Sequence, residues 1–341
     1  MAEPPPETAS HPTPTADERL VAESVEHGMI GAGDEIRAAA ITSGPDQPKR
    51  RGLGWGAWLA IGWLGFIVLT AILAKTKIFT WGDPLGNSRV NTLRCAERGP
   101  LADQGGAPGF LLGCDSNGRS MAARLALGSW TSLLVSTGAI VIGFSIGGSI
   151  GLVAGYFGGK IDTVISSVFN VLLSIPAIVL AIALVAVLKG DQSHPGGLPI
   201  ELILIIAIGV VAIPLVGRIS RASALSWSQR EFVLAAKAQG ARHGRIMIRE
   251  LLPNVAPAMF SISLLGIAVA IVAEGTLAVL GISVQPPTPS WGQIIADDRS
   301  RIATSPHILL EPALLIFFTV FALNFLGDVI RARFDVREGA L

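Results

Sequence analysis

Six apolar runs, each long enough to cross a lipid bilayer, constrain this chain more than any other feature. Half of its 341 residues are hydrophobic and only 15% are charged, against about a quarter charged in soluble domains. A crossing needs about 20 apolar residues, and a backbone in lipid must satisfy its own hydrogen bonds, so each run is predicted to be a helix. The predicted class is an all-α, polytopic membrane protein with six transmembrane helices, at residues 53–73, 125–154, 161–188, 200–216, 255–282 and 308–330.

The segments outside these runs divide the chain into regions. Residues 1–48 carry nine acidic and two basic side chains and no sustained apolar period, which is typical of a disordered tail. We therefore expect a disordered acidic tail over 1–52, ending in the basic patch Lys49-Arg50-Arg51, and then a first helix over 53–73. An outer loop over 74–124, a core of five helices over 125–332 and a short tail over 333–341 complete the predicted organisation.

Lys and Arg side chains predict which segments face the cytoplasm. Seven of them lie between Arg218 and Arg249, and three more lie between Arg331 and Arg337. Because cytoplasmic segments of membrane proteins carry an excess of Lys and Arg, both termini and the polar loop 218–253 are predicted to be cytoplasmic. The net charge of only +1 gives no reason to expect nucleic acid as a partner.

Both cysteines, Cys95 and Cys114, fall in the predicted outer loop. An oxidising compartment would allow a disulfide between them. Such a bond would close a loop of roughly 20 residues and contribute about 3 kcal/mol in the chain-entropy account. Two unpaired thiols remain the alternative at this stage.

Five glycines recur at every fourth residue through the second run: Gly143, Gly147, Gly151, Gly155 and Gly159. This spacing places them along one stripe of a helix, where the missing side chains let another helix approach closely. The stripe is either ordinary helix packing or a contact that slides during transport. In both cases this side of the helix is expected to face protein.

The sequence contains no motif for nucleotide binding or for catalysis. A phosphate-binding loop would need glycine at Ala154 and Ser or Thr at Ile161, on either side of Gly159-Lys160. The five histidines are scattered, which argues against a metal site, and no serine occupies a Gly-x-Ser-x-Gly elbow. We therefore expect no catalytic residue, metal or cofactor in this chain, so any ATP would be bound by another polypeptide.

Glu274 is the only carboxylate well inside one of the six runs. An ionisable group at that depth is costly and must face protein or water. It is either a structural hydrogen-bonding group or part of a substrate or proton pathway.

The polar loop 218–253 carries its own helical pattern. Small and apolar residues occupy most positions from Phe232 to Ala238, polar ones occupy Glu231, Lys237 and Gln239, and Gly240 follows as a helix stop. A basic, amphipathic stretch over 242–249 then leads to Pro253. The pattern predicts a short helix, a turn and a second helix, a shape suited to docking into a groove of a soluble partner.

At these residues the chain resembles the EAA loop of ABC-importer permeases, and more narrowly the C-type permease subunit of the dipeptide, oligopeptide and nickel importer family. The resemblance covers about 52–337. The supporting segments are Glu231 to Gly240 with Leu251-Leu252-Pro253-Asn254, Leu112 to Arg119, Ala154 to Asp162, Glu274 to Gly281, Gln285 to Gly292, and Asn324 to Asp328.

The resemblance implies a type I ABC-importer permease in the bacterial plasma membrane. Its expected partners are a homologous second permease, two ABC ATPase subunits that bind ATP and Mg²⁺, an extracytoplasmic solute-binding protein, a peptide substrate and membrane lipid. The implied ATPase-coupling residues are Glu231, Leu234, Ala235, Ala236, Gly240, Leu252 and Pro253. Asp115, Gly118 and Arg119 are implied to shape the outer loop or to contact the binding protein.

The chain departs from the family pattern at several positions. Leu234 stands where the motif has its glutamate, and Glu231 lies one helical turn earlier. Cys114 replaces a threonine and Ser120 an aspartate. Two other functions stay open: a proton-coupled secondary transporter that uses Glu274, and a membrane scaffold that recruits a soluble partner without transporting anything.

Overall fold

The computed structural model describes residues 54–76, 99–100, 112–190 and 197–338, with side chains as far as Arg333. The chain divides into two units, 1–52 and 53–341. The predicted acidic tail and most of the predicted outer loop, including Cys95, lie outside the described residues.

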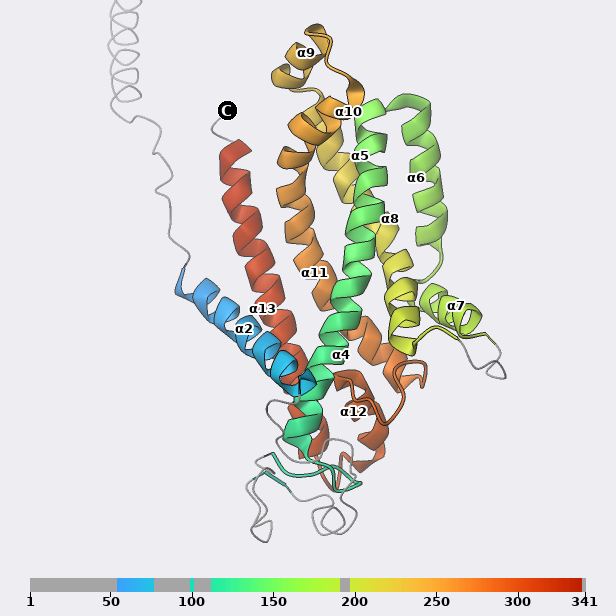
Figure 1. Cartoon of the computed structure of the whole chain (residues 1–341), viewed down its shortest axis with the longest axis vertical. Coiled ribbons are helices and arrows are strands. Elements are labelled where there is room, and N and C mark those ends of the chain that lie inside the picture. Colours follow the sequence, from blue (N-terminus) through green and yellow to red (C-terminus); the bar gives the residue numbers. More distant parts are fainter. Residues whose placement is uncertain (1–53, 77–98, 101–111, 191–196, 339–341) are drawn as a thin grey trace, which may run out of the picture. The chain divides into compact units, whose positions relative to one another are not determined.

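The described residues are almost entirely helical, with one isolated β-bridge between Cys114 and Ser120 (Figure 1). The α-helices are α2 (Trp55–Lys75), α4 (Met121–Ile142), α5 (Gly148–Phe157), α6 (Gly159–Ser174), α7 (Ala177–Lys189), α8 (Ile200–Ser228), α9 (Glu231–Ala238), α10 (His243–Arg245), α11 (Leu252–Val279), α12 (Trp291–Asp298) and α13 (His307–Glu338). Two π-helical segments, η1 (Gly143–Gly147) and η2 (Ile246–Leu251), and one 3₁₀ turn, η3 (Arg299–Arg301), connect them.

The apolar runs correspond to the long helices. Over the described residues, five helices are long and apolar enough to cross a membrane, and α6 with α7 provides a sixth if this bent pair is one span. The pair bends by 88°. The bend follows from Pro176: Ile175 is extended, as residues before proline prefer, so α6 ends there and α7 starts in a new direction.

Several helices extend beyond the predicted runs. The α8 helix runs to Ser228, so the first part of the predicted polar loop is a continuation of this helix. The fifth span starts at His243 and passes through α10 and η2 into α11 without interruption. Hydropathy marks only the apolar part of a helix, which explains why the predicted runs were shorter.

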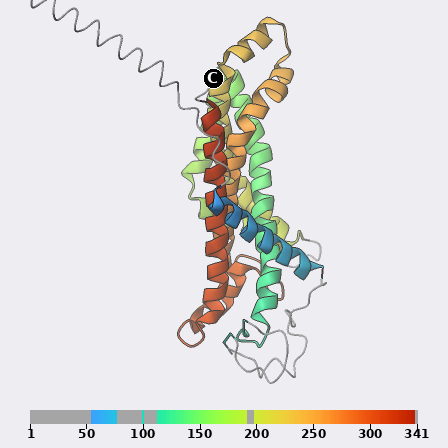
Figure 2. The same cartoon turned by 90° about the vertical axis from the view of Figure 1, so that its left-hand side faces the viewer.

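The core is built around α8 and α11. The α8 helix packs along α4, η1 and α5, while α11 packs against α13, α4 and α8. The α2 helix crosses α13 (Figure 2). Serine hydroxyls support these contacts: Ser220 donates to the Gly148 carbonyl at 2.7 Å, and Ser261 donates to the Gly327 carbonyl at 2.8 Å.

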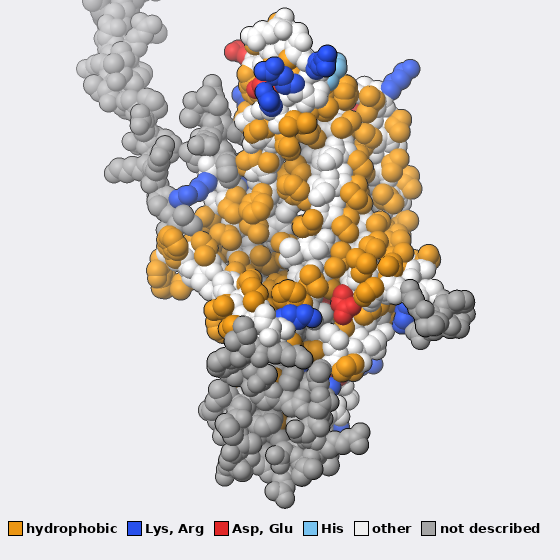
Figure 3. All heavy atoms as spheres, in the orientation of Figure 1, with side chains coloured by type: hydrophobic (Ala, Val, Ile, Leu, Met, Phe, Trp, Pro, Cys, Tyr) orange, Lys and Arg blue, Asp and Glu red, His pale blue; other side chains and the backbone are white. Residues whose placement is uncertain are grey.

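The two ends of the bundle differ in character. The α9 helix lies at the same end as the end of α13, and α12 lies at the opposite end beside the start of α4 (Figure 1). Hydrophobic side chains cover the middle of the bundle, and Lys and Arg side chains gather around α9 (Figure 3). The α9 end is therefore basic, and the described residues of the predicted outer loop lie at the α12 end.

Candidate functional site

The α9 helix forms and ends as its sequence dictates. Alanines favour helix, Glu231 occupies the first turn and Lys237 the last, where each complements the helix dipole. Gly240 then adopts a φ of +77°, and its N–H donates to the Lys237 carbonyl at 3.0 Å. The Ala241 N–H donates to the Ala236 carbonyl at 3.1 Å, which completes a Schellman-type stop that favours glycine.

One face of α9 is anchored in the bundle. Val233 is fully buried and Ala236 is partly buried, in a cluster that continues through Ile246, Leu251 and Val255 into α11. Leu152 of α5 and Val216 of α8 belong to the same cluster. The helix packs on η2 and α8, and its apolar cluster extends to α5 and α11.

The opposite face of α9 is exposed. Glu231, Leu234, Ala235 and Ala238 follow one another at intervals of three, one and three residues, which places them on one side of the helix. Leu234 keeps 53% of its surface exposed. The predicted coupling residues thus divide into an anchored set and an exposed set.

The two remaining coupling residues lie where the loop re-enters the bundle. Leu252 is partly buried against the cluster, and Pro253 sits in the first turn of α11, directly after η2.

Contacts that the sequence did not predict hold the turn after α9 to α5. The Tyr156 hydroxyl and His243 Nδ1 are 2.8 Å apart, and the Lys237 ammonium lies 5.1 Å from the centre of the Tyr156 ring. Tyr156 is the chain's one tyrosine, but nothing in its sequence position signals a partner 87 residues away.

The glycine stripe packs against α8 over four of its five members. A Cβ at Gly143 would lie 2.8 Å from the Ala212 Cβ, and one at Gly155 would lie 2.5 Å from the Arg221 carbonyl oxygen. Gly147 and Gly151 meet the carbonyl oxygens of Ile213 and Gly217 more closely still. Gly159 is different: it lies past the contact, at the first position of α6, with a φ of +54° and no atom within 4 Å of where its Cβ would be.

Glu274 is buried, with 1% of its surface exposed, and serine hydroxyls surround it. Ser283 and Ser290 donate to its Oε1 at 2.7 and 2.8 Å, and Ser132 of α4 donates to its Oε2 at 3.4 Å. The Ser132 oxygen also accepts from the Trp291 backbone N–H at 3.1 Å. The carboxylate thereby joins α11, α4 and the start of α12.

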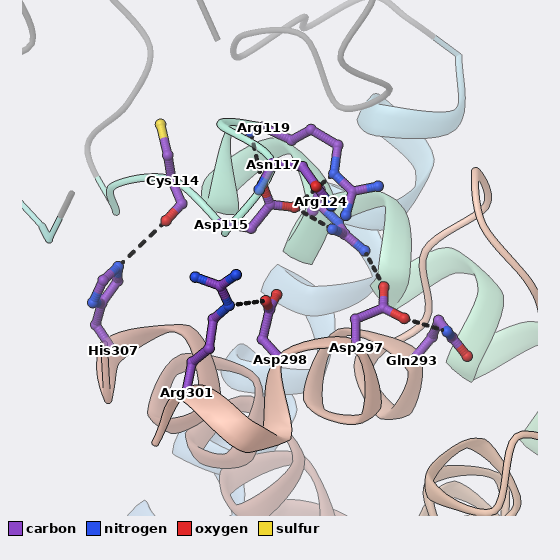
Figure 4. Close-up of polar contacts among 10 residues, drawn as sticks. All are labelled: Cys114, Asp115, Asn117, Arg119, Arg124, Gln293, Asp297, Asp298, Arg301 and His307. Carbon is purple, nitrogen blue, oxygen red and sulfur yellow. Dashed lines mark hydrogen bonds and ion pairs between the residues drawn. The ribbon is translucent and has the colours of Figure 1, made fainter. Parts of the chain in front are cut away.

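Asp115 is the centre of an ionic network beside α12 (Figure 4). Its Oδ1 accepts from the backbone N–H groups of Asn117 and Arg119, at 3.0 and 2.8 Å. Its Oδ2 accepts from Arg119 Nε at 2.6 Å and from the Arg124 guanidinium. Gly118 provides the turn, with a φ of +73°.

Arg124 extends this network to α12. Its Nη2 donates to Asp297 Oδ2 at 3.2 Å, although 173 residues separate the two in the chain. Asp298 is buried beside them, and burial raises the pKa of its carboxyl. A hydrogen bond with Ser116 and the charge of Arg124 lower it, whereas the charges of Asp115 and Asp297 raise it further. The sequence pointed to Asp115 and Arg119 but not to these long-range partners.

Cys114 is disulfide-bonded, and its carbonyl oxygen lies 3.4 Å from His307 Nε2 of α13. Because Cys95 lies outside the described residues, the predicted pairing of the two cysteines stays a prediction. Within the described part of the chain, no group of three or more His, Cys, Asp or Glu side chains is placed to hold a metal ion.

Comparison with known proteins identifies similar sequences over most of this bundle. Residues 147–338 match the family model described as the binding-protein-dependent transport system inner membrane component. The dipeptide transport system permease protein DppC of Alkalihalophilus pseudofirmus is 35% identical over 232 residues, covering 68% of this chain and 73% of that protein. DppC of Haemophilus influenzae is 30% identical over 280 residues, with 82% and 90% covered.

Two further comparisons agree with this result, one in sequence and one in fold. The glutathione transport system permease protein GsiD of Pectobacterium atrosepticum is 32% identical over 233 residues, covering 68% of this chain and 74% of that protein. The inward-facing MetNI methionine ABC transporter matches in structure with a TM-score of 0.51 at 22% identity, covering 62% of this chain and 97% of the solved one. At that identity the structural match speaks for the fold alone.

Proposed function

The chain belongs to the family of binding-protein-dependent transport system inner membrane components, and from this premise we propose that it is the permease subunit of an ATP-driven importer of peptides. Permeases of this family work with other components of an ABC transporter. The relatives named for dipeptide and glutathione transport support peptides as the substrate class. The translocation pathway would be shared with a homologous second permease.

The observation that carries the proposal is the division of α9 into two faces. Val233 and Ala236 belong to an apolar cluster that extends into α5, α8 and α11, whereas Leu234 is exposed and available to a partner. Two ATPase subunits, binding ATP and Mg²⁺, would dock on this exposed face, and their closure would push the 226–252 segment. The N- and C-termini and α9 would face the cytoplasm of a bacterium, and an extracytoplasmic binding protein would deliver peptide at the α12 end.

Reconstitution tests this function directly. The chain would be placed in vesicles with the second permease and ATPases encoded beside it, with ATP and Mg²⁺ on the ATPase side and peptide-loaded binding protein on the other. We expect ATP-dependent uptake of labelled dipeptide that survives collapse of the proton gradient. Uptake that needs the gradient but no ATP would instead identify a secondary transporter, and hydrolysis without any uptake would identify a scaffold.

A single substitution separates these outcomes further. Gly240→Trp would force a bulky side chain into a positive-φ position at the end of α9. We expect this variant to lose its ATPase subunits on purification and to lose uptake with them. A secondary transporter would keep its uptake.

A further inference from the structure

The exposed stripe of α9 contains one large side chain among small ones. Glu231, Leu234, Ala235 and Ala238 share this face, and Leu234 is 53% exposed. The alanines would let a partner approach the helix backbone closely, so Leu234 would be the one apolar side chain of the stripe that projects into it, with the Glu231 carboxylate beside it. An apolar projection of this kind fits a pocket with an apolar floor.

The surroundings of the stripe are basic. Between residues 230 and 250 there are five Lys or Arg side chains and two Glu. Arg230, Lys237, Arg242, Arg245 and Arg249 are all exposed, and they gather at the α9 end of the bundle (Figure 3). A partner with acidic side chains around its pocket would be electrostatically complementary to this arrangement.

A lipid surface fits the stripe less well than a protein groove. Helices that lie in a membrane interface present a broad apolar face with several large side chains. Here the stripe has Leu234 as its one large apolar side chain. Phe232, the other large apolar side chain that α9 exposes, is 37% exposed and its ring centre lies 6.1 Å from that of Trp227. The buried face, where Val233 lies, is already occupied by the bundle.

We infer that Leu234 is a specificity-determining residue for the ATPase subunit, which receives it in an apolar pocket framed by acidic side chains. This inference rests on the proposed function, because the partner is the ATPase. A carboxylate at position 234 would be buried without a counter-charge in such a pocket. An ATPase whose groove offers a basic side chain at this point would be a poor partner for this chain.

The test measures the affinity of the ATPase subunits for the complete permease pair in lipid nanodiscs. We expect Leu234→Glu to weaken binding by about 100-fold, the effect of burying an unpaired charge. Leu234→Met, which conserves volume and polarity, should weaken it by less than about tenfold. Gln239→Glu adds the same charge at an exposed position on the flank of α9 and should change binding by less than about fivefold.

The salt dependence of binding separately tests whether acidic side chains surround the pocket of the ATPase. Raising NaCl from about 0.1 M to about 0.5 M shortens the range of charge interactions, so wild type and Leu234→Met should both bind the ATPase more weakly. Salt-independent binding would overturn the acidic frame. An equal loss in Gln239→Glu and Leu234→Glu would overturn the apolar pocket, since charge alone would then explain both.

The proposed function and this inference fail in different ways. If the wild-type permease pair binds no ATPase at all, the proposed function fails. If the wild type binds it and Leu234→Glu binds as tightly, only the inference fails, as it would if Leu234 instead inserted among lipid headgroups. Because Leu234 is exposed, its variants should have the same melting temperature as the wild type.

Discussion

Glu274 has a structural environment that predicts the effect of removing its side chain. In Glu274→Ala, the hydroxyls of Ser283, Ser290 and Ser132 lose their acceptor in a buried site, which should lower the free energy of unfolding by about 3 kcal/mol. Glu274→Gln should cost only about 1 kcal/mol. Its carbonyl can still accept from Ser283 and Ser290, and its amide can donate to the Ser132 oxygen. Denaturant titration in detergent measures both.

The control is Glu201→Ala, in the first turn of α8. It removes a carboxylate that interacts with the helix dipole, worth about 0.5 kcal/mol. A Glu274→Ala variant as stable as this control would contradict the structural role. A Glu274→Gln variant of normal stability with no uptake would point to a role in a proton or substrate pathway.

Asp298 predicts a pH dependence of stability. Burial raises the pKa of its carboxyl in the folded protein, so the folded state keeps the proton at pH values where the unfolded chain has released it. Its favourable contribution is therefore present below the ordinary Asp pKa and is lost as the pH rises through the raised value. We expect Asp298→Asn to be more stable than wild type near neutral pH, with the advantage shrinking toward about pH 4.

Unfolding curves of the two proteins across this pH range provide the measurement. The rest of the sequence is the same in both proteins, so the difference between the curves reports the effect of the Asp298 carboxyl. A difference that stays constant with pH would show that this carboxyl does not titrate differently in the folded state.

Sequence patterns predicted single residues only where the signal was local. Asp115, Gly118 and Arg119 lie within one turn, so a short motif contains all three. Arg124 lies directly before an apolar run, where a charged residue is common, so its position suggests no partner. Asp297 lies 173 residues further along the chain. No periodicity in a single sequence connects such distant partners.

Among the helices, the α5–α8 contact depends on the absence of side chains. A Cβ at Gly151 would meet the Gly217 carbonyl oxygen and lie 2.9 Å from the Ser220 Cβ, so Gly151→Ala must push two backbones apart. We expect a loss of about 2–3 kcal/mol in the free energy of unfolding, the usual cost of overpacking, measured by denaturant titration in detergent. Gly62→Ala in α2, where nothing lies within 4 Å, is the matched control and should be at least as stable as wild type. Equal stability of the two variants would contradict the close contact.

The element boundaries show what hydropathy can and cannot predict. Five of the six apolar runs correspond to single long helices, and the third is divided between α6 and α7. The sharp bend at Pro176 was not predicted, although Ile175 before proline carries the local signal for it. Gly159 was assigned to the stripe by spacing alone, and it lies instead at the first position of α6 with a positive φ.

Across the bundle, the predicted helix, turn and helix of the polar loop are present, but the way they join the membrane helices was beyond the sequence. Val233 of α9 meets Ile246 and Leu251 of η2, and through them Val255 and Met259 of α11. These contacts depend on how α5, α8 and α11 pack at one end. They provide a mechanical path from the exposed stripe to the core that α8 and α11 share.

Two adjacent residues of α9 should therefore have separate effects. Leu234 should affect binding of the ATPase, and Val233 should affect how motion of α9 is passed to α11. Val233→Ala removes two methyl groups from the buried cluster but leaves Leu234 and its face unchanged. We expect the ATPase to stay bound within about threefold, whereas the peptide imported per ATP hydrolysed falls, because α9 can move without moving α11. Paired uptake and hydrolysis assays in vesicles measure this ratio of peptide imported to ATP hydrolysed.

The control is Val185→Ala, an equal deletion in the separate buried cluster around α7 and α8. It should lower the free energy of unfolding by a similar amount, about 1–3 kcal/mol, and leave the ratio unchanged. An unchanged ratio in Val233→Ala would mean that motion reaches the core by another route.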